Sequence, residues 1–228
     1  MNNICSVFHT SPRPSRLVTP SSALPLPLSS SNSTTMPAPK DGAESTPYHA
    51  GKRDNTALQA HVAFFDPDGD GIIWPLDTFR GFRDLGFGLI LSVLSMFIIH
   101  GGFSWVTFGT LLPDPFFRLN IKNMHRGRHG SDTASYTATG QFDEDRFNYV
   151  FNMYSSKPHT SLTFTEGVRM LYGNREAFDF FGWFAATFEW LATYLMLWPE
   201  DGRLKKEDVR AVYDGSIFYK VSGRKMNH

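Results

Sequence analysis

The stretch DPDGDGIIWPLD, residues 66–77, places four aspartates in a twelve-residue segment. Asp66, Asp68 and Asp70 take the first, third and fifth places, Gly71 takes the sixth, and Asp77 takes the twelfth. Calcium binds about seven oxygen atoms at roughly 2.3 to 2.6 Å, and this spacing wraps carboxylates and one backbone carbonyl around a single point. The sequence therefore predicts an EF-hand calcium site whose ligands are Asp66, Asp68, Asp70, Ile72 and Asp77.

The last ligand departs from the usual pattern, because Asp77 stands where most EF-hands have Glu. Aspartate is one methylene shorter, so two-oxygen coordination from this position is harder. We expect an affinity toward the weaker end of roughly 10⁻⁷ to 10⁻⁵ M, or a shift toward magnesium.

EF-hands pair through a short β contact at their eighth position, which here is Ile73. Two later segments, 155–166 and 197–208, carry Leu162 and Leu204 at the same place but have no acid at their first and third places. Either they keep the scaffold without the ion, or they are ordinary connections between helices.

The residues around the loop predict helices. Leu58, His61, Val62 and Phe65 recur at helical spacing and share one face. Helices are also expected over 143–154, 175–198 and 206–213, and the dense aromatic residues of the second of these are expected to pack in the core.

Residues 85–113 contain no Asp, Glu, Lys or Arg. The stretch exceeds the roughly 20 residues that a helix needs to cross a bilayer. His100 and the adjacent Gly101 and Gly102 weaken a straight helix near its middle. Three interpretations stay open at this point: two short helices in a soluble core, one membrane span, or a hairpin that enters a lipid surface and returns.

The amino-acid composition narrows the kinds of function and fold that the protein can have. Lys and Arg number 22, as do Asp and Glu, so net charge offers no attraction for nucleic acid. The one cysteine, Cys5, excludes an internal disulfide framework. Residues 1–51 are rich in Ser and Pro, which predicts a disordered tail, with a targeting segment as the alternative. We expect a mostly α fold: an EF-hand-containing helical domain with an apolar helical hairpin and a disordered N-terminal tail.

The segment HRGRH places His125 and His129 four residues apart. This spacing would present two imidazoles to a metal on a helix, but Gly127 and Gly130 favour a loop, so zinc is not predicted.

Five blocks of the sequence resemble the caleosins, a family of plant and fungal lipid-droplet peroxygenases. The resemblance runs from about Leu58 to Phe218. The blocks, in the family's order, are HVAFFDPDGDGIIWP, the apolar segment after the loop, PDPFFRLNIKNMHRGRHGSD, GNREAFDFFGW and YDGSIF. The short proline motif Pro113-Asp114-Pro115 and the Leu76-Asp77 loop end depart from the plant pattern and point to a fungal-type member.

The resemblance implies a calcium-binding haem b enzyme that transfers oxygen from fatty-acid hydroperoxides to unsaturated lipids. It also implies that His61 and His129 are the haem-linked histidines, with either one as the axial ligand. A thiolate ligand would need a core cysteine, and Cys5 lies in the tail.

The family further implies a lipid-droplet or endoplasmic-reticulum membrane location facing the cytoplasm, while homo-oligomerisation stays open. The expected organisation is a tail (1–51), an EF-hand region (52–84), an apolar lipid-associating segment (85–115) and a C-terminal helical region with degenerate EF-like loops (116–228). Two alternatives are a noncatalytic calcium-dependent lipid-droplet tether and a soluble calcium sensor with a Phe-rich face.

Overall fold

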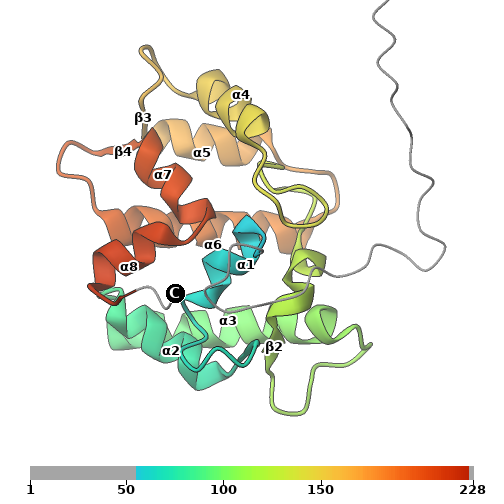
Figure 1. The fold of residues 1–228 in the computed structure, drawn as a ribbon. Helices are drawn as coiled ribbons and strands as arrows, with labels where there is room; N and C mark the ends of the chain where they lie inside the picture. Colours follow the sequence, from blue (N-terminus) through green and yellow to red (C-terminus); the bar gives the residue numbers. More distant parts are fainter. Residues whose placement is uncertain (1–54, 226–228) are drawn as a thin grey trace, which may run out of the picture. The chain divides into compact units, whose positions relative to one another are not determined.

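The computed structural model describes residues 55–225, so the expected disordered tail over 1–51 and Cys5 lie outside it. The described chain is mostly helical, as predicted (Figure 1). Its elements in chain order are α1 (Ala57–Ala63), β1 (Ile72–Ile73), α2 (Pro75–Asp84), α3 (Leu89–Phe108), β2 (Leu119–Asn120), the 3₁₀ helix η1 (Ile121–Gly127), α4 (Glu144–Tyr154), β3 (Ser161–Thr163), α5 (Phe164–Gly173), α6 (Phe180–Leu197), β4 (Arg203–Lys205), α7 (Lys206–Tyr213) and α8 (Ser216–Ser222).

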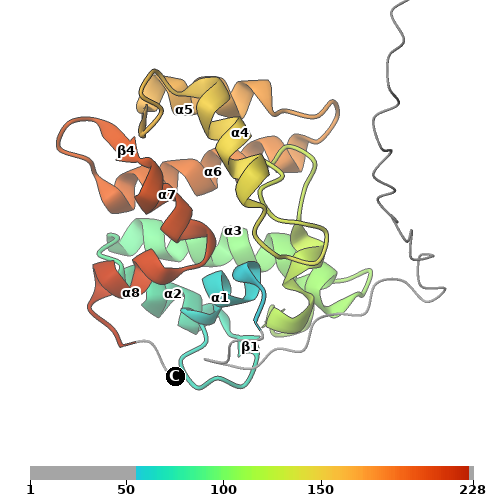
Figure 2. The same cartoon turned by 45° about the horizontal axis from the view of Figure 1, so that its top comes forward.

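A helix–strand–helix unit recurs four times along the described chain: α1–β1–α2, α3–β2–η1, α4–β3–α5 and α6–β4–α7. β1 pairs antiparallel with β2, and β3 pairs antiparallel with β4. Helix–loop–helix units joined by such short strands have the arrangement of paired EF-hands. We name residues 57–127 the N-terminal lobe and residues 144–213 the C-terminal lobe, shown in cyan to green and yellow to red in Figures 1 and 2.

The β pairing joins different loops from those that the sequence suggested. Ile73 lies opposite Leu119, in the connection after α3, and not opposite either of the two later loops. Leu162 and Leu204 instead lie opposite each other. All four side chains are almost fully buried. Burial of such a side chain contributes about 1.5 to 3 kcal/mol, so each short ladder anchors the core of its lobe.

The apolar segment is one continuous helix, and the expected hairpin is wrong. α3 runs through His100, Gly101 and Gly102 without a break. A Cβ atom at position 102 would lie 2.9 Å from the ring of Phe181, so the glycine permits close contact with α6. His100 is held by Thr78 and by the carbonyl of Phe117. These tertiary contacts offset the roughly 1 kcal/mol cost of a helical glycine.

α3 turns its polar side inward and its apolar side outward. It packs against α2, η1 and β2. The buried side chains are polar, namely Ser92, Ser95, His100, Ser104 and Thr107, whereas the exposed ones are large and apolar, namely Leu89, Ile90, Leu94, Phe97 and Trp105. Within residues 55–225, α3 is the one helix long and apolar enough to cross a membrane. Because the polar side of α3 packs on the protein, one apolar side of the helix is left exposed.

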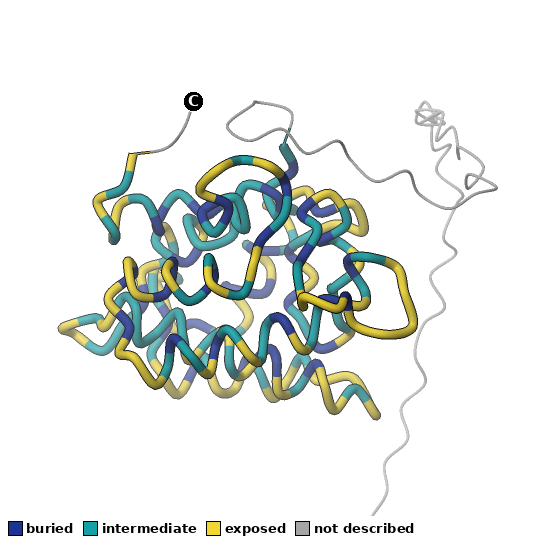
Figure 3. The backbone as a smooth tube through the Cα atoms, turned by 90° about the horizontal axis from the view of Figure 1, so that it is seen from below, coloured by how far each residue is buried: buried dark blue, intermediate teal, exposed yellow. Residues whose placement is uncertain are grey.

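The aromatic residues around α6 differ from the expected core packing. The helix itself is confirmed, but Phe178, Phe180, Phe184 and Trp198 are exposed. The side of α6 that packs inward carries small residues, Gly182, Ala185 and Ala186. Figure 3 shows the same alternation of buried and exposed turns along the helices of the described chain. Small residues on the inward side let α6 approach its neighbours closely. The bulky rings lie on the opposite side of the helix, which faces outward.

α8 folds back onto the N-terminal lobe. The ring of Phe218 lies 5.5 Å from that of Phe64 and 4.9 Å from that of His61. Together with Ile217, Phe82 and neighbouring residues, it forms a buried cluster that fixes α1 from one side.

Candidate functional site

The first three aspartates of the 66–77 loop converge on one point. Ligand oxygens of Asp66, Asp68 and Asp70 all lie within 4.8 Å of one another. Gly69 and Gly71 make the turns between them with φ angles of 72° and 86°, in the region that favours glycine. The N–H groups of these two glycines donate to the Asp66 carboxylate at 3.1 and 3.0 Å. Three like charges this close favour a cation between them, so the residues present fit calcium.

Asp77 does not join that cluster. Its Oδ2 atom accepts a hydrogen bond from the Trp74 N–H at 3.1 Å, at the start of α2. Its Oδ1 atom lies 3.8 Å from the guanidinium of Arg80. The Asp77 carboxylate thus caps the N-terminus of α2 and does not reach the cluster, which agrees with the short reach expected of Asp at this place.

In the loop over 155–166, the carboxylate of Glu166 is hydrogen-bonded by residues of the same loop. The carboxylate of Glu166 accepts hydrogen bonds from the N–H of Ser156 and the N–H of Thr163, each at 2.8 Å, and from both hydroxyls. Hydrogen bonds from the Ser156 side chain and the Thr163 backbone lower the pKa of Glu166 to about 2. These donors replace a cation, so the loop keeps the hand geometry without carboxylates at its first and third places.

A cavity of about 220 Å³ lies between α1, α3, η1 and α6. Its walls are largely apolar and include Ile73, Ile99, Phe103 and Met124. Leu58, His61, Val62 and Phe65, the four residues predicted to share one face of α1, all line it. The predicted face is therefore confirmed, and the cavity is what it faces.

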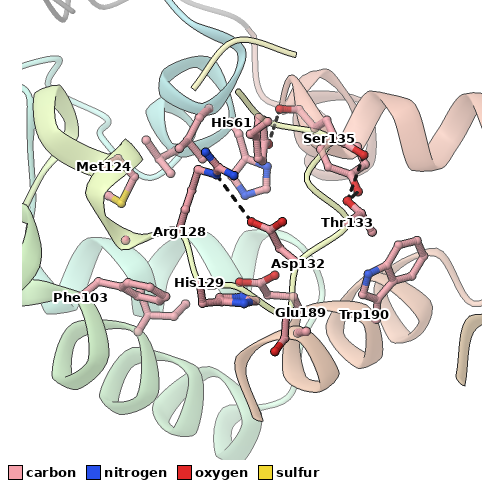
Figure 4. Close-up of a pocket in the computed structure, with 18 of the residues that line it drawn as sticks. His61, Phe103, Met124, Arg128, His129, Asp132, Thr133, Ser135, Glu189 and Trp190 are labelled. Carbon is pink, nitrogen blue, oxygen red and sulfur yellow. Dashed lines mark hydrogen bonds and ion pairs between the residues drawn. The ribbon is translucent and has the colours of Figure 1, made fainter. Parts of the chain in front are cut away.

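His61 and His129 both line this cavity, from α1 and from the loop after η1 (Figure 4). η1 ends at Gly127, so His125 and His129 are not presented together on a helix, and His125 is not among the described residues that form the cavity wall. The two histidines that the family resemblance singled out, 68 residues apart in the sequence, thus line one cavity.

The imidazole of His61 is oriented by the backbone. Its Nδ1 atom lies 2.6 Å from the carbonyl oxygen of Val212. A carbonyl oxygen only accepts, so Nδ1 carries the proton and Nε2 keeps its lone pair. Burial lowers the pKa of His61, against the opposing effects of Val212 and Asp214, and this favours the neutral ring. A neutral imidazole with one nitrogen fixed by a carbonyl is the usual state of a metal-binding histidine.

The imidazole of His129 is less constrained. Its Nδ1 atom is buried without a hydrogen bond and lies 4.0 Å from the Asp179 carboxylate. That carboxylate is already engaged by the N–H and hydroxyl of Ser131 at 2.8 and 2.7 Å. Burial lowers the pKa of His129, while Asp132 and Asp179 act in the opposite direction. The ring thus offers a buried nitrogen that has no hydrogen-bond partner within the described chain.

Sequence reasoning did not identify three charged residues of the cavity wall, Arg128, Asp132 and Glu189. Arg128 and Asp132 form an ion pair at 3.6 Å (Figure 4). Glu189 is open to the cavity yet surrounded by protein, and burial followed by the Asp132 charge raises its pKa to about 7. A lone carboxylate in the otherwise uncharged α6 was the available signal, because its cost in apolar surroundings needs a reason.

A polar cluster closes the cavity beside Glu189. The hydroxyl of Tyr213 lies 2.7 Å from the Thr133 hydroxyl, which donates to Ser135 at 2.9 Å. The hydroxyl of Tyr136 donates to the carbonyl of Tyr213 at 2.6 Å. Burial raises the pKa of Tyr213 to about 12, so it remains a neutral hydroxyl at physiological pH.

The donors of this cavity fit a haem group. His61 offers an oriented Nε2 lone pair, His129 offers a buried nitrogen without a hydrogen bond in the described chain, and apolar side chains surround both. Imidazole ligation inside an apolar pocket is the arrangement in which many proteins hold haem.

Comparison with known proteins identifies relatives along most of the chain. The family described as "Caleosin related protein" matches residues 53–222. A protein named "Peroxygenase" from Lilium longiflorum is 40% identical over 81% of this chain and 76% of its own length. "Probable peroxygenase 4" from Arabidopsis thaliana is 37% identical over 74% of this chain and 86% of its own length. A third protein, "Probable inactive peroxygenase-like protein" from Arabidopsis thaliana, is 31% identical over 64% of this chain and 70% of its own length. No solved structure matches the chain.

Proposed function

Because this chain belongs to the caleosin family, we propose that it is a calcium-binding haem peroxygenase that works at the surface of lipid droplets. The observation that carries the proposal is the convergence of His61 and His129 on one apolar cavity. The proposed substrates are fatty-acid hydroperoxides as oxygen donors and unsaturated lipids as acceptors. That the chain is a fungal-type member, as expected from the loop and the proline motif, stays a prediction, since the relatives above are plant proteins.

His61 is the histidine better placed to hold the haem group. Its ring is held by the Val212 carbonyl at Nδ1 and packs against the ring of Phe218, so Nε2 is the nitrogen left for a metal on a ring that lines the cavity. An oriented ligand loses little freedom when it binds, and this favours affinity. His129 lacks such an orienting hydrogen bond within the described chain and would be the more easily displaced of the two histidines.

Haem, when bound, supplies the iron chemistry that breaks the O–O bond of a hydroperoxide and moves its oxygen to an alkene. The chain's part is to hold and surround the reactants. Ile99, Phe103 and Met124 exclude water from the cavity, while Glu189, with a pKa of about 7, can hold or release a proton at its carboxylate. The hydroxyls of Tyr136 and Tyr213 remain neutral beside it.

The calcium loop is proposed to stiffen the frame of the haem site. Only two residues separate Asp66 from the end of α1, and α1 carries His61. A cation held by Asp66, Asp68 and Asp70 therefore fixes the end of the helix that presents the ligand. Ile72 is proposed to add its backbone carbonyl, and Asp77 to add a carboxylate that leaves Trp74 when the cation binds.

The outward side of α3 is proposed to lie on lipid. Ile90 is 85% exposed and Phe97 is 67% exposed, and an apolar surface of this kind is unfavourable in water. The connection after α3 continues the surface with Leu111 and Leu112. Because the polar side of α3 packs on the protein, we propose that the helix lies along a droplet or endoplasmic-reticulum surface, with the lobes on the cytoplasmic side.

The test is spectroscopic. The purified full-length chain should show a Soret band and hydroperoxide-dependent oxygen transfer. The band should be lost or strongly shifted in His61→Ala, and changed less in His129→Ala. His125→Ala is the matched control, because His125 is outside the cavity wall formed by the described residues. A full-length chain that takes up no haem under any of these conditions would contradict the proposal.

A second candidate is a noncatalytic calcium-dependent lipid-droplet protein. One relative that is 31% identical to this chain is named as probably inactive. Protein that floats with droplets but binds no haem would favour this alternative.

A further inference from the structure

A second cavity of about 190 Å³ adjoins the first. His61, Glu189, Trp190 and Tyr213 line both, so the two spaces meet at the proposed reaction centre. From there the second cavity extends between α2, the C-terminal half of α6, α7 and α8.

The two ends of this second cavity differ in chemistry. The shared end carries an imidazole, a carboxyl and phenol hydroxyls. Beyond it, the described residues of the wall are apolar, such as Phe82, Leu85, Phe87 and Met196, with Thr193 as the one polar side chain among them. A ligand that matches both ends has a polar group at one end and a long hydrocarbon part at the other.

The apolar end lies next to the surface that we assign to lipid. Leu85 and Phe87 are buried in the short connection between α2 and α3. Directly after them, Leu89 and Ile90 are 62% and 85% exposed at the start of α3. The second cavity thus ends beneath the corner where the exposed apolar side begins.

We infer that the second cavity binds the hydrocarbon chain of a fatty-acyl substrate, with its oxidised or unsaturated segment delivered to the His61 end. The inference rests on the proposed function and adds the place where the chain is held. We propose that the apolar end holds one part of the acyl chain and that the first cavity holds the remainder.

The hydrocarbon interpretation is favoured over a polar ligand by the wall itself. Beyond the shared end, the wall residues that the structure describes carry no charge and offer no amide or carboxylate side chain. A buried peptide or sugar would leave its polar groups unpaired there, whereas an acyl chain has none to pair.

Photolabelling tests the inference on the unmodified full-length chain. An 18-carbon fatty acid with a diazirine at its methyl end is irradiated with the protein, and the labelled peptides are identified by mass spectrometry. We expect label in 82–87 and 192–196, the two segments that line the apolar end. Label confined to the exposed side of α3, or to residues of the first cavity alone, would overturn the inference.

Substitutions that fill the second cavity provide a second measurement. Ala192 and Thr193 line it from α6, and Ala192→Phe or Thr193→Phe should weaken binding of the fluorescent 18-carbon polyene cis-parinaric acid at least tenfold. Ala177→Phe is the matched control, because Ala177 is exposed and lines neither cavity. If a filled variant keeps its helical circular dichroism and still binds the polyene as tightly as the unchanged chain, the inference is wrong.

These experiments distinguish failure of the acyl-chain inference from failure of the proposed function. A chain that binds the polyene and is labelled at 192–196 but takes up no haem retains the acyl site and loses the peroxygenase assignment. A chain with a Soret band whose label lies elsewhere retains the haem site and loses the acyl site. In the haem-loaded filled variants, turnover of a short hydroperoxide such as tert-butyl hydroperoxide should persist while that of the 18-carbon substrate falls.

Discussion

Gly215 lies directly against the backbone of His61: a Cβ atom at position 215 would be 2.7 Å from the His61 Cα atom and 2.9 Å from the Ala60 carbonyl oxygen. Gly215 also has a φ of 74°, which L residues with side chains rarely adopt. The residue before α8 therefore sets how closely the end of α7 approaches the helix that carries His61.

Gly215→Ala should consequently displace α1 and weaken haem binding. Forcing the left-handed conformation costs about 1 to 2 kcal/mol, and the clash with the backbone adds to it. We expect a lower melting temperature and a reduced or shifted Soret band. Gly223→Ala is the control, because Gly223 has a φ of 71° but, apart from its own chain neighbours, no described residue lies within 4 Å of the place that a methyl group would take. Equal effects of the two substitutions would show that the contact with His61 is unimportant.

Asp77→Glu should tighten calcium binding. The extra methylene lets the carboxylate reach the aspartate cluster while the start of α2 stays in place. Isothermal titration calorimetry should show a fall in Kd of about tenfold, equivalent to about 1.4 kcal/mol. Asp77→Asn should weaken binding, which checks that position 77 acts as a ligand. Unchanged affinity in both variants would remove Asp77 from the ligand set.

The same titration should give one calcium ion per chain. Glu166 is engaged by Ser156 and Thr163, so the loop over 155–166 has no need of a cation. Glu166→Gln should destabilise the C-terminal lobe by about 1 to 3 kcal/mol, because hydrogen bonds to a charged acceptor are lost. It should leave the calcium stoichiometry unchanged. A stoichiometry that falls in Glu166→Gln would show that this loop binds the ion after all.

Asp114 should make stability depend on acidity. It lies between two prolines, pairs with Arg118 at 2.8 Å, and accepts from the Phe116 N–H. The hydrogen bond from the Arg118 side chain is the main reason why the pKa of Asp114 falls to about 2. The lowered pKa means that ionised Asp114 stabilises the folded chain. This contribution to the free energy of unfolding is complete above pH 3.8, the ordinary pKa of the group, and is lost as pH falls through about 2. Melting temperatures of the unchanged chain and of Asp114→Asn should therefore differ at pH 5 and converge near pH 2.

Charges on the outward side of α3 should abolish lipid binding without unfolding the protein. Ile90→Glu with Phe97→Glu places two charges at positions that are 85% and 67% exposed, where little packing is lost. Flotation with oil droplets or liposomes should fall at least tenfold, while the melting temperature changes little. The matched control is Tyr149→Glu with Met153→Glu, on exposed positions of α4. Continued flotation of the α3 variant would assign lipid binding to another surface.

The local features of the chain could be predicted from its sequence. The face of α1, the convergence of Asp66, Asp68 and Asp70, and the bounds of α7 follow from spacing over a few residues, and the structure agrees with each of them. The full set of five calcium ligands stays a prediction. The pairing of Ile73 with Leu119 could not be predicted, because the loop before Leu119 has no ligand pattern and pairing depends on contacts distant in sequence.

The orientation of the two apolar helices was beyond sequence reasoning for a related reason. Hydropathy suggests that large apolar residues are buried, yet α3 buries Ser95 and Ser104 and exposes Phe97. Small polar residues at helical spacing allow close packing, and that signal is weak beside the apolar run. Glu189 is a similar case, because it is a single carboxylate in an aromatic stretch and nothing local in the sequence places it on the cavity that His61 lines.

The inverted arrangement of α3 bears on how the protein would reach and leave the lipid surface proposed above. Arrival would cover one side of a helix that is already folded and already paired with the rest of the chain, so no backbone hydrogen bond would have to break and no segment would have to thread through a leaflet. Departure is the same event in reverse. Residence on a droplet would then follow the available lipid area and the number of competing chains, and it would respond within one lifetime of the protein as droplets grow or shrink.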